Sequence, residues 1–226
     1  SKPKEESDLR TDFWQTVYSL VGGGRFVYKR GMNRLLLLAV LSLVSSPVLR
    51  SADPVLKADF ASEGLPEGWK GMKGEWKVVD GALVGSELAA DQHAAVFNIP
   101  DPHVNSSLKM KVRLDGAKGF HLSYNHAKGH LFRVAITGGQ ATLSMDKDKK
   151  DPASKAETLA KETLALKPGE WVEISCTVEG TKVKVTVGDA VLEGTHPNLA
   201  KEKTGYRFVV QGQSVAFDEV AFVSGR

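Results

Sequence analysis

The chain has 226 residues with 30 Lys and Arg, 27 Asp and Glu and a single Cys, and 42% of its residues are hydrophobic and 25% charged. This ordinary globular composition excludes collagen-like, coiled-coil, disordered and disulfide-scaffold proteins. Residues 1–52 hold eight Lys and Arg against four Asp and Glu, so residues 53–226 are close to neutral, and we expect no nucleic acid among their partners.

Residues 32–52 have the three parts of a secretory signal peptide. Met32-Asn33-Arg34 is the short basic segment, an apolar run follows over residues 35–44, and small residues lead to Ala52. A spanning helix needs about 20 apolar residues, and Pro47 and Arg50 interrupt this run early. The pattern predicts a periplasmic or extracellular protein with no membrane span after cleavage; an uncleaved anchor is the alternative.

Residues 1–31 precede this leader, and we expect them to be an extension of the gene model upstream of a true start at Met32. If they are translated, they form a cytoplasmic extension. The run Gly22-Gly23-Gly24-Arg25 lacks the Gly-Lys-Ser/Thr ending of a phosphate-binding loop, so it predicts no nucleotide site.

Residues 53–226 predict a single all-β domain, a two-sheet antiparallel β-sandwich. Short runs of alternating apolar and polar residues recur every eight to twelve positions, separated by turn residues. We expect strands at residues 55–60, 75–79, 82–86, 94–99, 108–114, 120–124, 131–137, 140–145, 171–178, 182–187, 190–193, 206–211 and 215–223. A domain of this size buries about 70% of its unfolded surface without disulfides.

Two turns and one stripe of side chains set the expected register. Asp80-Gly81 and Gly138-Gly139 each predict a two-residue hairpin that needs positive φ. Within residues 108–114 the apolar side chains alternate with Lys109, Lys111 and Arg113, which predicts one buried and one solvated face. We interpret the basic stripe as a solvated outer face, with an acidic-polymer site as the less favoured reading.

Four further features are predicted to be structural. Cys176 alternates in phase with apolar neighbours, which indicates an inert buried thiol. Residues 146–157 predict a long surface loop, since three interleaved lysines disfavour a Ca²⁺ site. Residues 156–165 fit a short helix or another strand, and the sequence leaves both open. Trp76 and Trp171 are expected in the core.

The hairpin of residues 120–134 holds the best cluster of polar groups. If its loop spans residues 125–129, Tyr124 faces His130 and His121 faces Arg133, while Ser123 emerges on the same outer surface as that pair. An imidazole, a hydroxyl and an Arg fork suit the vicinal hydroxyls of a sugar. A polar cross-strand pair with no ligand is the structural alternative.

Other residues are candidates to join this predicted sugar site. Tyr124 or Trp69 would cover an apolar sugar face, and His93 would reach the groove only through tertiary folding. A zinc site at His121, His126 and His130 is disfavoured, because these residues occupy a strand, a loop tip and the facing strand without a carboxylate. We expect no metal and no cofactor.

Several segments resemble the secreted bacterial 3-keto-disaccharide hydrolase domain: Asp59-Phe60, Gly68-Trp69, residues 74–83 and residues 206–220. The resemblance implies a concanavalin A-like or laminin G-like jelly roll, similar to glycoside hydrolase family 16. It also implies attack on a 3-keto sugar, for which His121 or His130 is eligible as the base and Arg133 as the group that steadies the enolate. Only Phe132-Arg133 echoes the Phe-Arg element of that family.

Three classes of function remain open from the sequence. The first is a non-catalytic carbohydrate-binding protein, the second a hydrolase or lyase of 3-keto-glycosides, and the third a structural envelope protein. Retaining glucanases of the jelly-roll type carry Glu-x-Asp-x-x-Glu or a close variant on one strand, and residues 53–226 contain no such run. An ordinary endoglucanase is therefore disfavoured.

Overall fold

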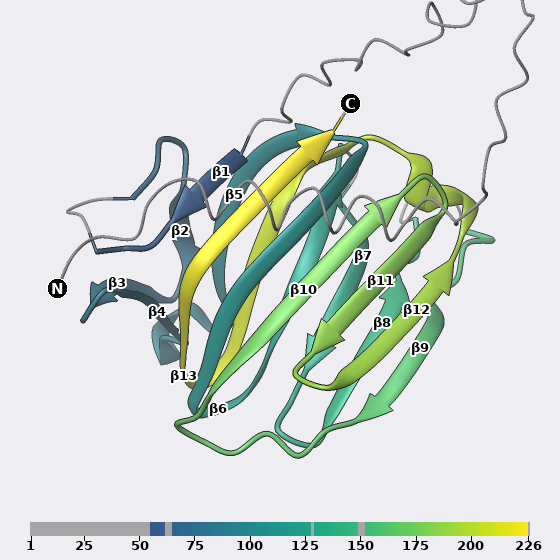
Figure 1. The fold of residues 1–226 in the computed structure, drawn as a ribbon. Helices are drawn as coiled ribbons and strands as arrows, with labels where there is room; N and C mark the ends of the chain where they lie inside the picture. The colour runs from purple at the N-terminus through teal and green to yellow at the C-terminus, as the bar shows by residue number, and fades with distance from the viewer. Residues whose placement is uncertain (1–54, 62–64, 128, 149–151, 226) are drawn as a thin grey trace, which may run out of the picture. The chain divides into compact units, whose positions relative to one another are not determined.

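The computed structural model describes residues 55–61, 65–127, 129–148 and 152–225, so the predicted extension and signal peptide lie outside the described residues. In the described part the chain is almost entirely β-strand, with two short 3₁₀ turns. Thirteen antiparallel strands form one continuous hydrogen-bonded sheet that folds over into two layers (Figure 1). No helix among the described residues has the length and apolar character needed to cross a membrane.

The layer nearer the viewer in Figure 1, here called the front layer, has the strand order β12-β11-β10-β6-β13-β4-β3. A short strand β1 pairs with the end of β13 at its side. The bounds are β1 Val55–Ala58, β3 Glu75–Val79, β4 Ala82–Ser86, β6 Asn105–His126, β10 Trp171–Glu179, β11 Lys182–Val187, β12 Ala190–Thr195 and β13 Lys203–Gly225.

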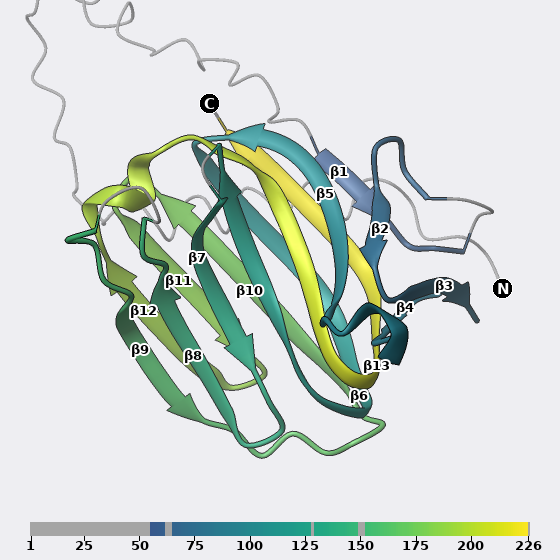
Figure 2. The same ribbon diagram turned by 180° about the vertical axis from the view of Figure 1, so that it is seen from behind.

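The other layer, here called the back layer, comes to the front in Figure 2. Its pairings run β9-β8-β7-β6-β13-β5-β2. The remaining strands are β2 Lys70–Lys73, β5 Ala95–His103, β7 Gly129–Ile136, β8 Gln140–Met145 and β9 Glu157–Thr163. The two-sheet sandwich expected from the alternating pattern is therefore confirmed.

Strands β6 and β13 belong to both layers, which the sequence did not indicate. Residues 108–114 and 120–124 were expected as two strands, as were 206–211 and 215–223, but each pair forms one continuous strand. The chain bends without leaving the ladder because Gly116 and Gly212 adopt φ values of 87° and 89°, with register shifts beside them. Both strands bulge at the same level, so they turn together from one layer into the other.

The inner faces of the two layers form the hydrophobic core as the alternation predicts. Leu108, Met110 and Val112 are buried on β6, and Cys176 is fully buried on β10. Burial raises the pKa of the Cys176 thiol to about 12, so the thiol is held protonated and unreactive. The basic stripe faces outward, and there Lys111 pairs with Glu219 at 2.5 Å.

One predicted hairpin has the expected turn geometry and the other does not. Asp80 and Gly81 have φ values of 50° and 77°, so the turn between β3 and β4 has the predicted form. Thr137 N also donates to Gln140 O across Gly138-Gly139, at 2.9 Å. Neither of these two glycines has a positive φ, so this hairpin turns with a different geometry.

Two strands were missed or left open by the sequence pattern. All four residues of β2 are exposed, so no alternation marks this strand. Strand β9 resolves the open segment in favour of a strand, which pairs with β8 at an edge of the back layer. Edge strands with little burial carry the weakest sequence signal, because the alternation reflects contact with a core.

The tryptophans divide between core and surface. Trp76 is half-buried and its ring lies 4.9 Å from Phe97 and 6.2 Å from Phe217. Trp171 is 40% exposed, so the expectation that it lies in the core is wrong. The guanidinium of Arg113 covers it at 4.7 Å, which gives this exposed ring a cationic partner on the front layer.

A buried lysine lies at one end of the sandwich. The side chain of Lys203, at the start of β13, is fully buried, and its ammonium donates to Val104 O at 2.5 Å and to Leu199 O. Burial lowers its pKa to about 8, because the charged form loses its hydration. The group therefore titrates well below an ordinary lysine.

Candidate functional site

A row of polar side chains crosses the outer face of the back layer on four neighbouring strands. Ser123 on β6 pairs with Arg133 on β7 on one side and with Arg207 on β13 on the other, and Arg207 in turn pairs with Asn98 on β5. Directly opposed residues in antiparallel strands have Cβ atoms about 5 Å apart. Two guanidinium groups thus flank Ser123, which is itself buried.

A second row runs parallel to the first, two residues along each strand. His121 on β6 pairs with Ala135 on β7 and with Val209 on β13, which pairs with Val96 on β5. The imidazole of His121 is half-buried among these groups. The two rows together give a floor that is polar along one row and mainly apolar along the other.

These rows enclose a pocket of about 290 Å³. Its lining is rich in imidazole and guanidinium groups: His93, Val96, His121, Ser123, His130, Arg133, Arg207, Val209 and Gln211. Among the described residues that line it there is no carboxylate. The volume lies at the lower end of the range for small-ligand sites, about 300–1,000 Å³.

Asp146 holds Arg133 in place at the edge of this lining. The Nε of Arg133 donates to Oδ2 of Asp146 at 2.9 Å, and a terminal guanidinium nitrogen donates to Oδ1. Bidentate pairs of this kind fix both the position and the plane of the guanidinium. Asp146 follows β8, so part of the segment predicted as a solvated loop instead supports the site.

His121 is kept in its neutral form by its surroundings. Burial lowers its pKa below the ordinary value, the nearby Arg133 lowers it further, and Asp146 opposes both. A neutral imidazole carries one donor and one acceptor nitrogen, which suits it to hydroxyl groups or to accepting a proton.

Arg207 has only a neutral partner among the described residues. Its Nε donates to Oδ1 of Asn98 at 3.2 Å, and no ion pair in the described part of the chain involves it. An Arg fork has five N–H donors. Its remaining donors and its charge are therefore available at the pocket.

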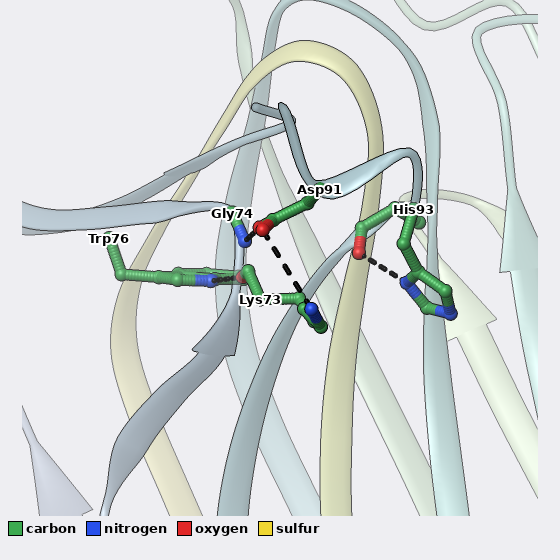
Figure 3. Close-up of polar contacts among 6 residues, drawn as sticks. Lys73, Gly74, Trp76, Asp91 and His93 are labelled. Carbon is green, nitrogen blue, oxygen red and sulfur yellow. Dashed lines mark hydrogen bonds and ion pairs between the residues drawn. The ribbon is translucent and has the colours of Figure 1, made fainter. Parts of the chain in front are cut away.

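His93 reaches the pocket from the loop that joins β4 to β5. The loop is anchored where Asp91 accepts a hydrogen bond from Gly74 N at 2.6 Å and lies 3.8 Å from the ammonium of Lys73 (Figure 3). Figure 3 shows the His93 ring directed away from that anchor, with Nδ1 2.7 Å from Ala94 O. The fold thus brings His93 to the pocket, although this residue is distant in sequence from the 120–134 hairpin.

A second hollow of about 450 Å³ adjoins the pocket through His93. It is lined by the same loop and by the bend of β13: Glu87, Leu88, Ala89, Gln92, His93, Ala94, Gly212 and Gln213. His93 lines both hollows, so the two lie next to each other on this side of the molecule.

His130 completes the pocket at the far end of the hairpin. Its Nδ1 lies 2.8 Å from Oδ1 of Asn125, the residue it pairs with across the strands. The hairpin is tighter than expected, because His126 pairs with Gly129 and a bulge follows Tyr124. His121 therefore faces Ala135, Ser123 faces Arg133 and Tyr124 faces Phe132, which corrects the predicted register by two residues and leaves His121, Ser123, Arg133 and Tyr124 on their predicted faces. His130, expected opposite Tyr124, instead pairs with Asn125 and lines the pocket.

Two of the residues proposed from the sequence lie away from the pocket. Tyr124 is fully buried on the inner face and its ring stacks on Phe132 at 4.2 Å. Trp69 is buried in the core, with Phe97 and Phe222 about 6 Å from its ring. Neither can cover a sugar, so Val209 and Val96 provide the apolar floor in place of aromatic rings.

The sequence analysis missed Arg207, Gln211 and the supporting Asp146. Arg207 and Gln211 alternate with buried residues of β13, so their outward direction was readable. The sequence does not show which strand lies beside β13, because the paired residues of β13 and β6 are 80 or more positions apart. Only the pairing brings Arg207 beside Ser123.

A shallower hollow of about 730 Å³ lies at β10, β11 and β12, and it is a weaker candidate. Lys184 and Glu193 line it and pair with each other at 2.9 Å, so their charges are already compensated. No group of three or more His, Cys, Asp or Glu side chains in the described ranges is arranged to hold a metal ion.

Searches with the sequence find no matching protein-family model and no matching curated protein. The fold, however, has many solved counterparts. The carbohydrate-binding module CBM66 of Bacillus subtilis is similar with a TM-score of 0.57 and 11% identity, over 70% of this chain and 96% of that one. A Bacillus subtilis protein of unknown function with a galectin-like fold has a TM-score of 0.57 and 10% identity, over 75% and 94%.

The CBM2 module of the evolved Dit protein of Lactobacillus casei BL23 phage J-1 is also similar, with a TM-score of 0.55 and 14% identity, over 75% of this chain and 94% of that one. At these identities the likeness shows the fold alone. The chain is a concanavalin A-like jelly roll, as the resemblance to the 3-keto-disaccharide hydrolase domain implied.

Proposed function

We propose that the protein binds carbohydrate in the pocket on the outer face of the back layer. The observation that carries this proposal is the pair of parallel rows, one polar through Arg133, Ser123 and Arg207 and one mainly apolar through Val209 and Val96. A sugar ring offers hydroxyl groups on its edge and C–H groups on its face. The first row supplies directed donors and acceptors, and the second supplies apolar contact.

The experiment is a glycan-binding screen followed by calorimetry with four proteins: wild type, His121→Ala, Arg133→Ala and the control Lys109→Ala. Lys109 is an exposed member of the basic stripe on the front layer, so its loss leaves the pocket intact. We expect at least a tenfold loss of affinity for the two pocket variants and no change for the control. Equal binding by all four proteins would place the site elsewhere.

A second candidate is cleavage of a 3-keto-glycoside, favoured by a neutral imidazole beside a guanidinium. His121 would accept the proton from the carbon next to the ketone, and Arg133 would stabilise the enolate oxygen that forms. The electron pair would then expel the glycosidic oxygen, which takes up a proton as the sugar leaves. Incubation with 3-keto-sucrose or a 3-keto-glucoside should release the second sugar, and absence of release leaves binding as the function.

We also propose that residues 32–52 direct export of the protein, as their sequence pattern suggests. Expression of the full chain in a bacterial host, with mass analysis of the fraction outside the cytoplasm, tests this. The expected product begins after Ser51 or Ala52, and an unprocessed cytoplasmic product would contradict it.

A further inference from the structure

We infer that the pocket is built for a negatively charged saccharide, one that carries a carboxylate on the sugar, and not for a neutral one. This inference rests on the proposed carbohydrate site and names its class of ligand. The balance of charge around Ser123 and the second hollow beside the pocket point to this class of ligand.

Two guanidinium groups lie on either side of Ser123, and among the described residues only one of them has a counter-ion. Arg133 is matched by Asp146 through two hydrogen bonds. Arg207, at the same level on the next strand, has the neutral amide of Asn98 as its side-chain partner and no ion pair among the described residues. Within the part of the chain that the structure describes, the site therefore carries an uncompensated positive charge at neutral pH.

The rest of the described lining of the pocket does not offset this charge, because it contains no carboxylate; Glu87 lines the adjoining hollow. His93, His121 and His130 all face the pocket, and each gains a positive charge when protonated. The overall composition does not explain this, because residues 53–226 are close to neutral. Positive character is thus concentrated in the pocket, where it favours an anion.

The geometry of Arg207 favours a carboxylate over a diffuse anion. A guanidinium fork matches a carboxylate through two parallel N–H···O bonds, and Asn98 fixes the fork through its Nε. The adjacent Val209 and Val96 would contact the ring of the same sugar. The second hollow beyond His93 gives room for a neighbouring sugar unit of an oligosaccharide.

The test uses matched ligands that differ only at the carboxyl group: tetragalacturonate and its carboxyl-reduced neutral counterpart, together with a panel of other uronate oligosaccharides and their reduced forms. Calorimetry is run with wild type, Arg207→Gln, Arg207→Lys and the control Lys109→Gln. We expect wild type to prefer at least one carboxylated ligand over its reduced form by tenfold or more. This preference should weaken as salt is raised.

The variants distinguish the contribution of the positive charge of Arg207 from that of its guanidinium geometry. Arg207→Gln should lose the preference for the carboxylated ligand and keep the residual affinity for the neutral form. Arg207→Lys should keep part of the preference, and Lys109→Gln should keep all of it. Circular dichroism and thermal melting confirm that the half-exposed Arg207 variants fold. Equal binding of charged and reduced ligands overturns this inference and leaves the proposed function standing. Absence of binding to both kinds of ligand across the panel overturns both.

Discussion

Arg133 and Asp146 form a two-point ion pair beside the pocket, and His121 lies within the electrostatic reach of both. The three groups come from β7, from the end of β8 and from β6. Removing the charge of either Arg133 or Asp146 should therefore change the pKa of His121, so this imidazole serves as an internal probe of the site.

We expect the pKa of His121 to move in opposite directions when its two charged neighbours are neutralised. Arg133→Gln should raise it, because the guanidinium lowers it in the wild type, and Asp146→Asn should lower it further. An NMR titration of the histidine ring protons measures both changes. Lys184→Gln, on the front layer, serves as the control and should leave the titration unchanged. Shifts of the same sign in both variants would contradict the arrangement.

Binding of a carboxylated oligosaccharide should strengthen as the pH falls from 7.5 to 5.5. The pKa of His121 lies below its ordinary value in the free protein, and a carboxylate nearby would raise it, so the bound state takes up a proton. The groups that face this imidazole from the neighbouring strands and loops are Arg133, Arg207, Asp146, His130 and His93.

Calorimetry at three pH values, in buffers of different ionisation enthalpy, measures the proton uptake directly. His121→Gln should flatten the dependence. A ligand that binds equally at all three pH values in the wild type would show that His121 does not sense the ligand.

The stability of the protein should respond to the titration of Lys203. Burial lowers the pKa of Lys203 from 10.5 to about 8, so between these values the unfolded chain binds the proton more tightly than the folded protein. The contribution of Lys203 therefore becomes more favourable as the pH rises through this window, by on the order of 3 kcal/mol in total.

The measurement is the difference in free energy of unfolding between wild type and Lys203→Met, from urea titrations at pH 7, 8, 9 and 10. Wild type should gain on the variant by about 1.4 kcal/mol per pH unit above pH 8. Because both proteins contain the buried Cys176 and the buried tyrosines, the pH-dependent contributions of these groups largely cancel in the difference between the two free energies. Exposed Lys109→Met should show no such slope, and a flat difference for Lys203→Met would mean that its amine is hydrated in the folded state.

Gly85 should tolerate no side chain, because the indole of Trp76 covers it. A Cβ at Gly85 would overlap the six-membered ring of Trp76, which is itself packed on Phe97 and Phe217. We expect Gly85→Ala to destabilise the protein by about 1–3 kcal/mol. Gly139→Ala is the matched control, since its Cβ meets open space at an ordinary φ. Urea unfolding of both variants provides the comparison.

The sequence predicts the layers and faces of this fold well, because each strand that contacts the core carries a period of two. The outward direction of His121, Ser123 and Arg133 followed from that period alone. It survived a register error of two residues, since a shift by an even number preserves the face. The error arose because the sequence does not show how tightly the hairpin closes at His126 and Gly129.

The content of the pocket could be predicted only in part. Arg207 and Asp146 reach it through long-range strand pairing and through a loop, and neither carries a local signal. Trp69 and Tyr124 were predicted to contact a sugar, because they are aromatic residues near polar ones in the sequence. Both are buried instead, because removing a large apolar ring from water stabilises the fold more than leaving it at the surface. The residue types indicated the chemistry of the site, whereas the pairing of β6 with β13 determines which residues line the pocket.

The passage of β6 and β13 through both layers also bears on how the molecule comes apart. Separating the layers requires breaking the two longest ladders at their bends, so neither half is a natural intermediate. We expect fraying at the outer strands β9, β12, β3 and β2, which lie two or three places from these shared strands in the pairing order. The binding surface, built on the central strands, should thus exchange its amide hydrogens only with global opening and be among the last regions to lose order.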